Sequence, residues 1–350
     1  GQPEVTEMGD KIRVGIVHCD LHAVYYATLI EDHDPLKLRS PRPPDYPNKT
    51  EWETGAAHFY HYTFYDDARK LTVETVDGFE VVKCWDPDPQ RAAIFSEVFY
   101  DKPVVCDTLE QVSDDVDLVF IGDCCGDGST HLERARPGLE KGVATFVDKP
   151  FAYTVADVKQ IFELADANNA PVMSLSILRS LPDATLFARR MPEIGGADYG
   201  TIFGGFTDLA GLIHTVSLNQ HIFGSGVQRV KRMSHEQQTL IHLDYGDRAD
   251  RPKWGVTINC MLYMPHCAMY ASAFGRRGRI HSPHFDDYVF PFGAAENLKK
   301  VRRMIETGEV QAPREEMIEC VAIAQASRLS EETGESIAVA DVVENRCAST

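Results

Sequence analysis

In the first half of the chain, short hydrophobic runs alternate with amphipathic stretches. Runs without polar interruptions are typical of strands buried on both faces of a parallel sheet. The clearest amphipathic stretch begins at Thr154, an expected N-cap, with Asp157 at the capping-box position. This alternation predicts a Rossmann-like, doubly wound α/β domain. The expected strands cover residues 11–17, 79–85, 117–123, 143–150 and 171–178, and the expected helices cover 21–30, 89–99, 131–142 and 154–170.

After about residue 195 the pattern changes to many short strands with little helix between them. A second α/β domain with a large, mostly antiparallel open sheet is therefore expected. We predict domains at 1–150, with a Pro- and aromatic-rich insertion at 31–76, and at 151–350, with the last helices packing back. The expected strands are 199–206, 237–246, 254–262, 267–274, 278–283 and 288–293; the expected helices are 212–224, 294–308 and 314–334.

Composition limits the class of protein and its partners. The chain has 350 residues, more than one ordinary domain, and no apolar run near the roughly 20 residues that cross a bilayer. Its net charge of −18 disfavours nucleic acid and membrane surfaces as partners. Nine cysteines are too sparse for a disulfide scaffold, and Cys84 and Cys260 lie in apolar runs. A cytoplasmic location is favoured; export would follow if a signal peptide preceded Gly1.

Chemically active side chains gather where the predicted parallel strands end. In open α/β sheets, ligands bind outside these carboxyl ends. Lys149 stands out because it is held between a buried strand and Pro150; the alternative is a solvated lysine at a strand end. The other side chains at these ends are His18, Asp20, His22, Asp86, Asp123, Cys124 and Asp148.

Residues 116–172 resemble the central stretch of the Gfo/Idh/MocA family (glucose–fructose oxidoreductase, inositol dehydrogenase and MocA). Asp148-Lys149-Pro150 stands in for the family's Glu-Lys-Pro, and His131 for its loop histidine. The resemblance implies a Rossmann domain, a second domain often used for oligomer contacts, and NAD or NADP chemistry on a sugar, cyclitol or related polyol. It implies catalytic roles for Lys149 and for His214. The alternative role for His214 is that of a buried histidine with satisfied hydrogen bonds in the domain interface.

The implied cofactor site departs from the family pattern. His18, Asp20 and Ala23 stand where the fingerprint has three glycines. A carboxylate about 5 Å from a pyrophosphate charge costs roughly 3 kcal/mol, or about a hundredfold in affinity. Asp86 favours NAD over NADP, or simply caps a helix, so NAD, NADP or no nucleotide all stay open. The expected cofactor-binding residues are His18, Asp20, Ala23, Asp86, Asp123, Cys124, His131 and Asp148.

Substrate contacts are expected from four side chains and an aromatic segment. Residues 58–67 carry rings suited to stacking on a sugar, or to packing as a β-ribbon. In the second domain Ala210 replaces the aspartate that the family has four residues before the histidine. His18 and His22 have metal-ligand spacing, but we assign no metal. The expected substrate-binding residues are Lys149, Arg179, His214 and His61.

Three functions agree with these features. The first is an NAD(P)-dependent oxidoreductase acting on a sugar or polyol. The second is a non-redox acid/base enzyme on the same scaffold, such as a keto-sugar lyase or hydratase, which would explain the missing glycines. The third is a non-catalytic sugar-binding protein. A homo-oligomer is expected by analogy with the family.

Overall fold

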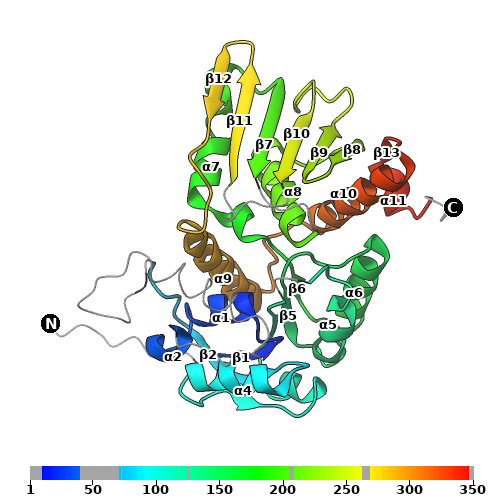
Figure 1. Cartoon of the computed structure of the whole chain (residues 1–350). Coiled ribbons are helices and arrows are strands. Elements are labelled where there is room, and N and C mark those ends of the chain that lie inside the picture. The colour runs from blue at the N-terminus through cyan, green and yellow to red at the C-terminus, as the bar shows by residue number, and fades with distance from the viewer. Residues whose placement is uncertain are drawn as a thin grey trace.

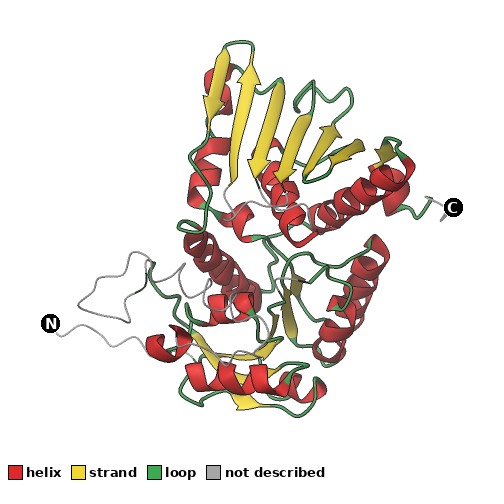
Figure 2. Ribbon diagram, viewed as in Figure 1, coloured by secondary structure: helices red, strands yellow, loops and turns green. Residues whose placement is uncertain are grey.

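The computed structural model describes residues 10–39, 71, 73–123, 126–204, 209–261 and 269–346. Two sheets with helices around them form two lobes, one above the other in Figure 1. Figure 2 shows helices and strands mixed in both lobes. The predicted fold class is confirmed: a Rossmann-like parallel sheet is followed by a second, mostly antiparallel sheet.

The first sheet has six parallel strands in the order β3-β2-β1-β4-β5-β6. This is the strand order of a dinucleotide-binding fold, and it brings the carboxyl ends of β1, β2 and β4 together at the switch point. The sheet includes β6, so it continues beyond the domain boundary expected at residue 150. The strands are β1 (Ile12–Val17), β2 (Phe79–Trp85), β3 (Val104–Val105), β4 (Leu118–Ile121), β5 (Ala144–Val147) and β6 (Val172–Met173).

Helices flank this sheet and follow the predicted pattern. They are α1 (Leu21–Ala27), α2 (Pro35–Arg39), α4 (Pro89–Val98), α5 (His131–Glu140) and α6 (Val155–Ala167), with a 3₁₀ turn at Glu110–Ser113. Ala23 of α1 lies so close to β4 that a Cβ on Gly122 would come within 2.8 Å of it. A small residue at position 23 therefore permits the close helix–strand packing that the third fingerprint glycine usually provides.

The N-cap of α6 gives a stability prediction. Thr154 Oγ1 accepts a hydrogen bond from the Asp157 amide at 3.1 Å, as the capping box predicted. Thr154→Ala should therefore lower the free energy of unfolding by about 1 kcal/mol. Chemical denaturation measures the change; Thr154→Ser is the control because it keeps the hydroxyl acceptor. Equal losses in both variants would contradict the capping role.

The second sheet has seven strands in the order β12-β11-β7-β10-β9-β8-β13, in which only the β7–β10 pair is parallel. Helices α8 and α10 pack against it (Figure 1). The strands are β7 (Tyr199–Gly204), β8 (Arg229–His235), β9 (Gln238–Asp244), β10 (Val256–Met261), β11 (Met269–Gly275), β12 (Gly278–His281) and β13 (Ile337–Ala338); the helices are α7 (Pro182–Ala188), α8 (Leu209–Phe223), α9 (Phe290–Thr307), α10 (Arg314–Thr333) and α11 (Val339–Val343), with 3₁₀ turns at Ile177–Ser180 and Met191–Ile194.

Two expected strands differ from the structure. The strand predicted at 288–293 is wrong, because α9 begins at Phe290 and Pro291 occupies its first turn. Proline is favoured there, since its missing N–H has no intrahelical partner in any case. The strand predicted at 171–178 is limited to β6, and Ser176 then caps the 3₁₀ turn by accepting from the Leu178 amide at 3.2 Å.

The late helices contact the first domain. Asn297 of α9 donates to the Tyr26 hydroxyl at 3.0 Å and to the Leu175 carbonyl at 3.3 Å. Gln325 of α10 accepts from the Val155 amide at 3.0 Å. These bonds hold the two lobes together around the segment that follows β5.

The described ranges contain no helix with the length and apolar character needed to cross a membrane. Cys84 and Cys260 are buried, as their apolar surroundings predicted.

Candidate active site

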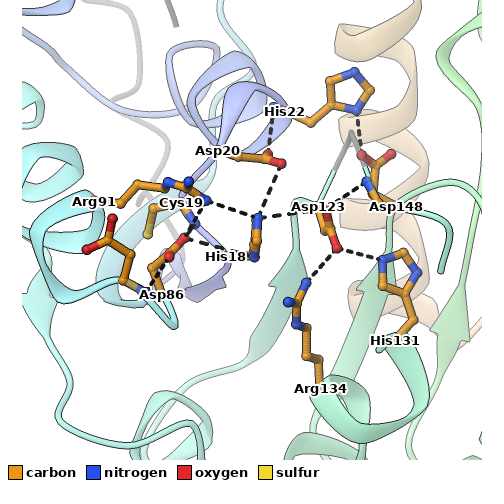
Figure 3. A network of polar contacts seen from close by, with 12 residues as sticks. His18, Cys19, Asp20, His22, Asp86, Arg91, Asp123, His131, Arg134 and Asp148 are labelled. Carbon is orange, nitrogen blue, oxygen red and sulfur yellow. Dashed lines mark hydrogen bonds and ion pairs between the residues drawn. The ribbon is translucent and has the colours of Figure 1, made fainter. Parts of the chain in front are cut away.

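His18 is the centre of a polar network at the carboxyl edge of the first sheet (Figure 3). It directly follows β1 and has a left-handed backbone (φ 68°), which glycine would adopt more easily. Its Nε2 lies 3.4 Å from Asp20 Oδ2 and 3.7 Å from Asp123 Oδ1, and its Nδ1 lies 4.0 Å from Asp86 Oδ2. Burial lowers the pKa of His18, but the hydrogen bond to Asp20 and the nearby carboxylates raise it above 6.5 overall.

Two arginines and a second histidine complete this network. Arg91 Nη1 lies 3.4 Å from His18 Nε2 and 3.7 Å from Asp86 Oδ2. Arg134 Nη1 donates to Asp123 Oδ2 at 2.6 Å, and His131 Nε2 lies 3.6 Å from the same oxygen. Burial raises the pKa of Asp123, but the hydrogen bond from His131 and the charges of His18, His131 and Arg134 lower it well below its ordinary value. The carboxylates are thus neutralised by the chain's own cations.

The residues at the first fingerprint positions do not fit a dinucleotide in the family's usual pose. Asp20 caps α1, accepts from the His22 amide at 3.2 Å and is only 1% exposed. Its carboxylate therefore occupies the helix N-terminus where a pyrophosphate would bind. His18 adds an imidazole at the tight turn. Only Ala23, buried against β4, matches the role of its glycine.

Both carboxylate oxygens of Asp86 accept hydrogen bonds from backbone amides of the chain. Its Oδ2 accepts from the Cys19 amide at 2.7 Å and its Oδ1 from the Asp88 amide at 2.8 Å. The carboxylate is 3% exposed. Oδ1 therefore stabilises the turn between β2 and α4, and Oδ2 joins that turn to the residues after β1; the N-cap of α4 is Asp88, which accepts from the Gln90 amide, and not Asp86. These contacts give no basis for choosing NAD over NADP.

His18, Asp20 and Asp123 also form a set of metal-type donors. One ligand atom from each lies within 4.8 Å of the others. The guanidinium groups of Arg91 and Arg134 lie against the same atoms and compete with a cation for them. His22, the partner that sequence spacing suggested for His18, points instead to Asp148.

Lys149 lies at the wall of a cavity between the two lobes. The side chain is buried, with 5% exposure of the residue, and the Lys149–Pro150 peptide is cis. Arg179 lines the same cavity and donates to Gln220 and Glu316. The cavity is small, with a volume of about 30 Å³, and its polar lining includes Lys149, Ser174, Ser176, Arg179, Ser217, Gln220 and Glu316.

His214 of α8 adjoins this cavity through Ser176. Its Nδ1 lies 2.7 Å from Ser176 Oγ, and Ser176 Oγ also accepts from the Leu178 amide, which fixes the hydroxyl. Burial holds the pKa of His214 well below 6.5, and the nearby Lys149 lowers it further. The imidazole is therefore neutral at pH 7 and able to accept a proton.

His22 belongs to this group, although sequence reasoning named it only as a strand-end side chain with metal-ligand spacing to His18 and assigned it no specific role. Its Nδ1 lies 2.5 Å from Asp148 Oδ2, and its ring centroid lies 6.4 Å from that of His214. Asp148, which was expected to bind the cofactor, is fully buried and directed to His22. The signal in the sequence was the position of both residues at strand ends of one parallel sheet.

Three expectations lie outside the described residues. These are the roles of Cys124 and His61 and the stacking role of the aromatic segment 58–67. The roles of the remaining site residues stay predictions.

The order of strands in the first sheet defines a protein of the Rossmann-like, dinucleotide-binding fold class. The model of the Gfo/Idh/MocA family, described as an oxidoreductase family with an NAD-binding Rossmann fold, matches residues 55–175. This segment matches that family's model, and the resemblance stated from the sequence is confirmed. No curated protein matches the sequence.

Solved structures share the fold of nearly the whole chain. The myo-inositol 2-dehydrogenase of Lactobacillus plantarum has a TM-score of 0.69 at 12% identity, covering 94% of this chain and 99% of that chain. A putative myo-inositol dehydrogenase of Sinorhizobium meliloti has a TM-score of 0.67 at 13% identity, and the match covers 94% of this chain and 99% of that chain. An oxidoreductase of Agrobacterium radiobacter was solved in complex with NAD+, L-tartaric acid and magnesium. It has a TM-score of 0.67 at 13% identity, and the match covers 94% of this chain and 99% of that chain. At these identities the likeness shows the fold.

Proposed function

We propose that this chain is an enzyme of its family's oxidoreductase class that acts on a sugar, cyclitol or related polyol in the cavity beside Lys149. One observation carries the proposal: Lys149 and Ser176, which holds the neutral His214, line the same cavity between the lobes. A buried amine and a buried imidazole beside one cavity supply the two groups that acid–base chemistry on a hydroxyl requires.

The chain's own residues can divide this work. The Lys149 ammonium donates hydrogen bonds to the oxygen of the reacting hydroxyl or carbonyl. Neutral His214 accepts the proton that leaves, or returns it in the reverse direction. Arg179, Gln220 and Glu316 offer donors and acceptors for the remaining hydroxyl groups.

The family description and the dehydrogenases of like fold support NAD as cofactor. When bound, a nicotinamide would supply hydride transfer. The carboxylate of Asp20 at the start of α1 opposes its usual pose, so the roles above are derived for protein groups alone.

That same carboxylate favours a second candidate, a non-redox acid/base enzyme such as a keto-sugar lyase or hydratase. In that reaction a base removes a proton from the carbon next to a carbonyl, and a β-substituent leaves with its bonding electrons. No nucleotide is required, so a buried carboxylate at the start of α1 would not interfere.

A two-arm assay tests the proposed function. In one arm, inositols and aldoses are mixed with NAD or NADP and nicotinamide absorbance is followed. In the other, the corresponding keto-sugars are followed by NMR without nucleotide. Turnover in either arm is expected and distinguishes the two candidates. If neither arm shows turnover and calorimetry detects no polyol or keto-sugar binding, the proposed function is wrong.

A further inference from the structure

The inference concerns His22 and Asp148, which come from different strand ends of the first sheet. His22 is in the first turn of α1, and Asp148 follows β5 (Figure 3). The short contact between His22 Nδ1 and Asp148 Oδ2 is the only hydrogen bond that Asp148 side-chain oxygens make among the described residues. The fully buried Asp148 carboxylate therefore makes its side-chain hydrogen bond with the His22 imidazole.

This contact selects one tautomer of His22. An ionised carboxylate only accepts hydrogen bonds, so the proton of the neutral ring resides on Nδ1. The lone pair is then on Nε2, for which the described part of the chain provides no hydrogen-bond partner. A carboxylate that holds an imidazole with Nε2 available is the arrangement that general-base histidines use.

The location of the pair fits a reacting centre. The His22 ring faces the His214 ring from the opposite lobe, with centroids 6.4 Å apart. Lys149 is the residue after Asp148, and Ser176, whose hydroxyl contacts His214, lines the same cavity as Lys149. His22 therefore lies beside His214, which adjoins the cavity that Lys149 lines.

We propose that His22 is a proton-transfer residue of this site, with Asp148 as its positioning residue, and that the pair acts on the carbon next to a carbonyl of a keto-sugar. The inference rests on the function proposed above and extends it. His22 Nε2 takes the proton as the C–H bond breaks, and the electron pair moves into the carbonyl to form an enediolate. The Lys149 ammonium stabilises the oxygen by hydrogen bonding. Return of a proton from His22 to the same carbon restores the ketone, so atoms and charges balance without an oxidant.

Deuterium exchange tests this step directly. Inosose, the monoketone of an inositol, and 3-ketoglucose are incubated with the full-length protein in D₂O without nucleotide, and loss of the α-proton signal is followed by NMR. His22→Asn should lower the exchange rate about a hundredfold. The asparagine amide takes the place of Nδ1–H as donor to Asp148, which preserves folding while removing Nε2. His235→Gln, at an exposed histidine of β8, is the matched control and should exchange at the wild-type rate.

A separate measurement tests whether Asp148 positions His22. In ¹⁵N spectra the His22 ring should show the Nδ1–H tautomer in the wild type and lose that preference in Asp148→Asn. A purely structural carboxylate would leave the tautomer unchanged. Thermal unfolding of each variant checks its fold, and His22→Gln provides a second substitution should His22→Asn unfold.

The outcomes separate the two proposals. Exchange lost in both Lys149→Met and His22→Asn supports both. Exchange lost in Lys149→Met but retained in His22→Asn overturns the role of His22 and leaves the proposed function standing. Exchange equal to the wild type in both variants overturns both. Absence of exchange by the wild type on both ketones, with turnover of a polyol and NAD, overturns the inference alone.

Discussion

Lys149→Met is expected to reduce kcat/KM about 10³-fold on whichever substrate the two-arm assay identifies. Methionine fills a similar volume but removes the ammonium, so the oxygen of the substrate loses its charged hydrogen-bond donor. General acid–base groups contribute about 10²–10⁴-fold, and a buried group acts without competition from bulk water. Steady-state kinetics measure the effect, with the loss expected in kcat more than in KM.

The control for this substitution is Lys299→Met. Lys299 is an exposed lysine of α9 whose ammonium pairs with Glu296 at 2.6 Å on the protein surface. It should retain wild-type kinetics. If Lys149→Met keeps its kcat while both variants stay folded, Lys149 takes no part in the chemistry.

The fold was predictable from the sequence because its signals are local. The uninterrupted apolar runs that became β1, β2, β4 and β5 could pack only as buried parallel strands. The Thr154 cap also follows from neighbouring residues. The error at 288–293 arose because Tyr288, Val289 and Phe290 favour strands, whereas the packing of α9 and Pro291 in its first turn decided the outcome.

The polar network was less predictable because its contacts are long-range. Strand order indicated that His18, Asp86 and Asp123 would lie at one edge of the sheet. It did not indicate that Asp86 would bind the Cys19 amide, or that Arg134 from the following helix would pair with Asp123. The contact between His22 and Asp148 joins residues 126 positions apart, and only side-chain orientation in the folded state reveals it.

The missing glycines have a consequence that can be reversed by mutation. Asp20 is the residue whose charge lies at the start of α1, whereas Ala23 already fits its position. Removing this charge therefore tests whether the nucleotide cradle is blocked by the carboxylate or absent altogether.

Asp20→Gly is expected to strengthen NADH binding about a hundredfold, which corresponds to the roughly 3 kcal/mol of repulsion removed. Asp20→Asn should give an intermediate gain, because it removes the charge but keeps a side chain at the cap; glycine costs the cap only a few tenths of a kcal/mol. Titration of NADH fluorescence measures both. Asp101→Gly is the control, since Asp101 is an exposed acid of the same domain with a left-handed backbone (φ 57°) that glycine adopts readily. Micromolar NADH binding by the wild type, unchanged in Asp20→Gly, would show that the carboxylate does not obstruct the nucleotide.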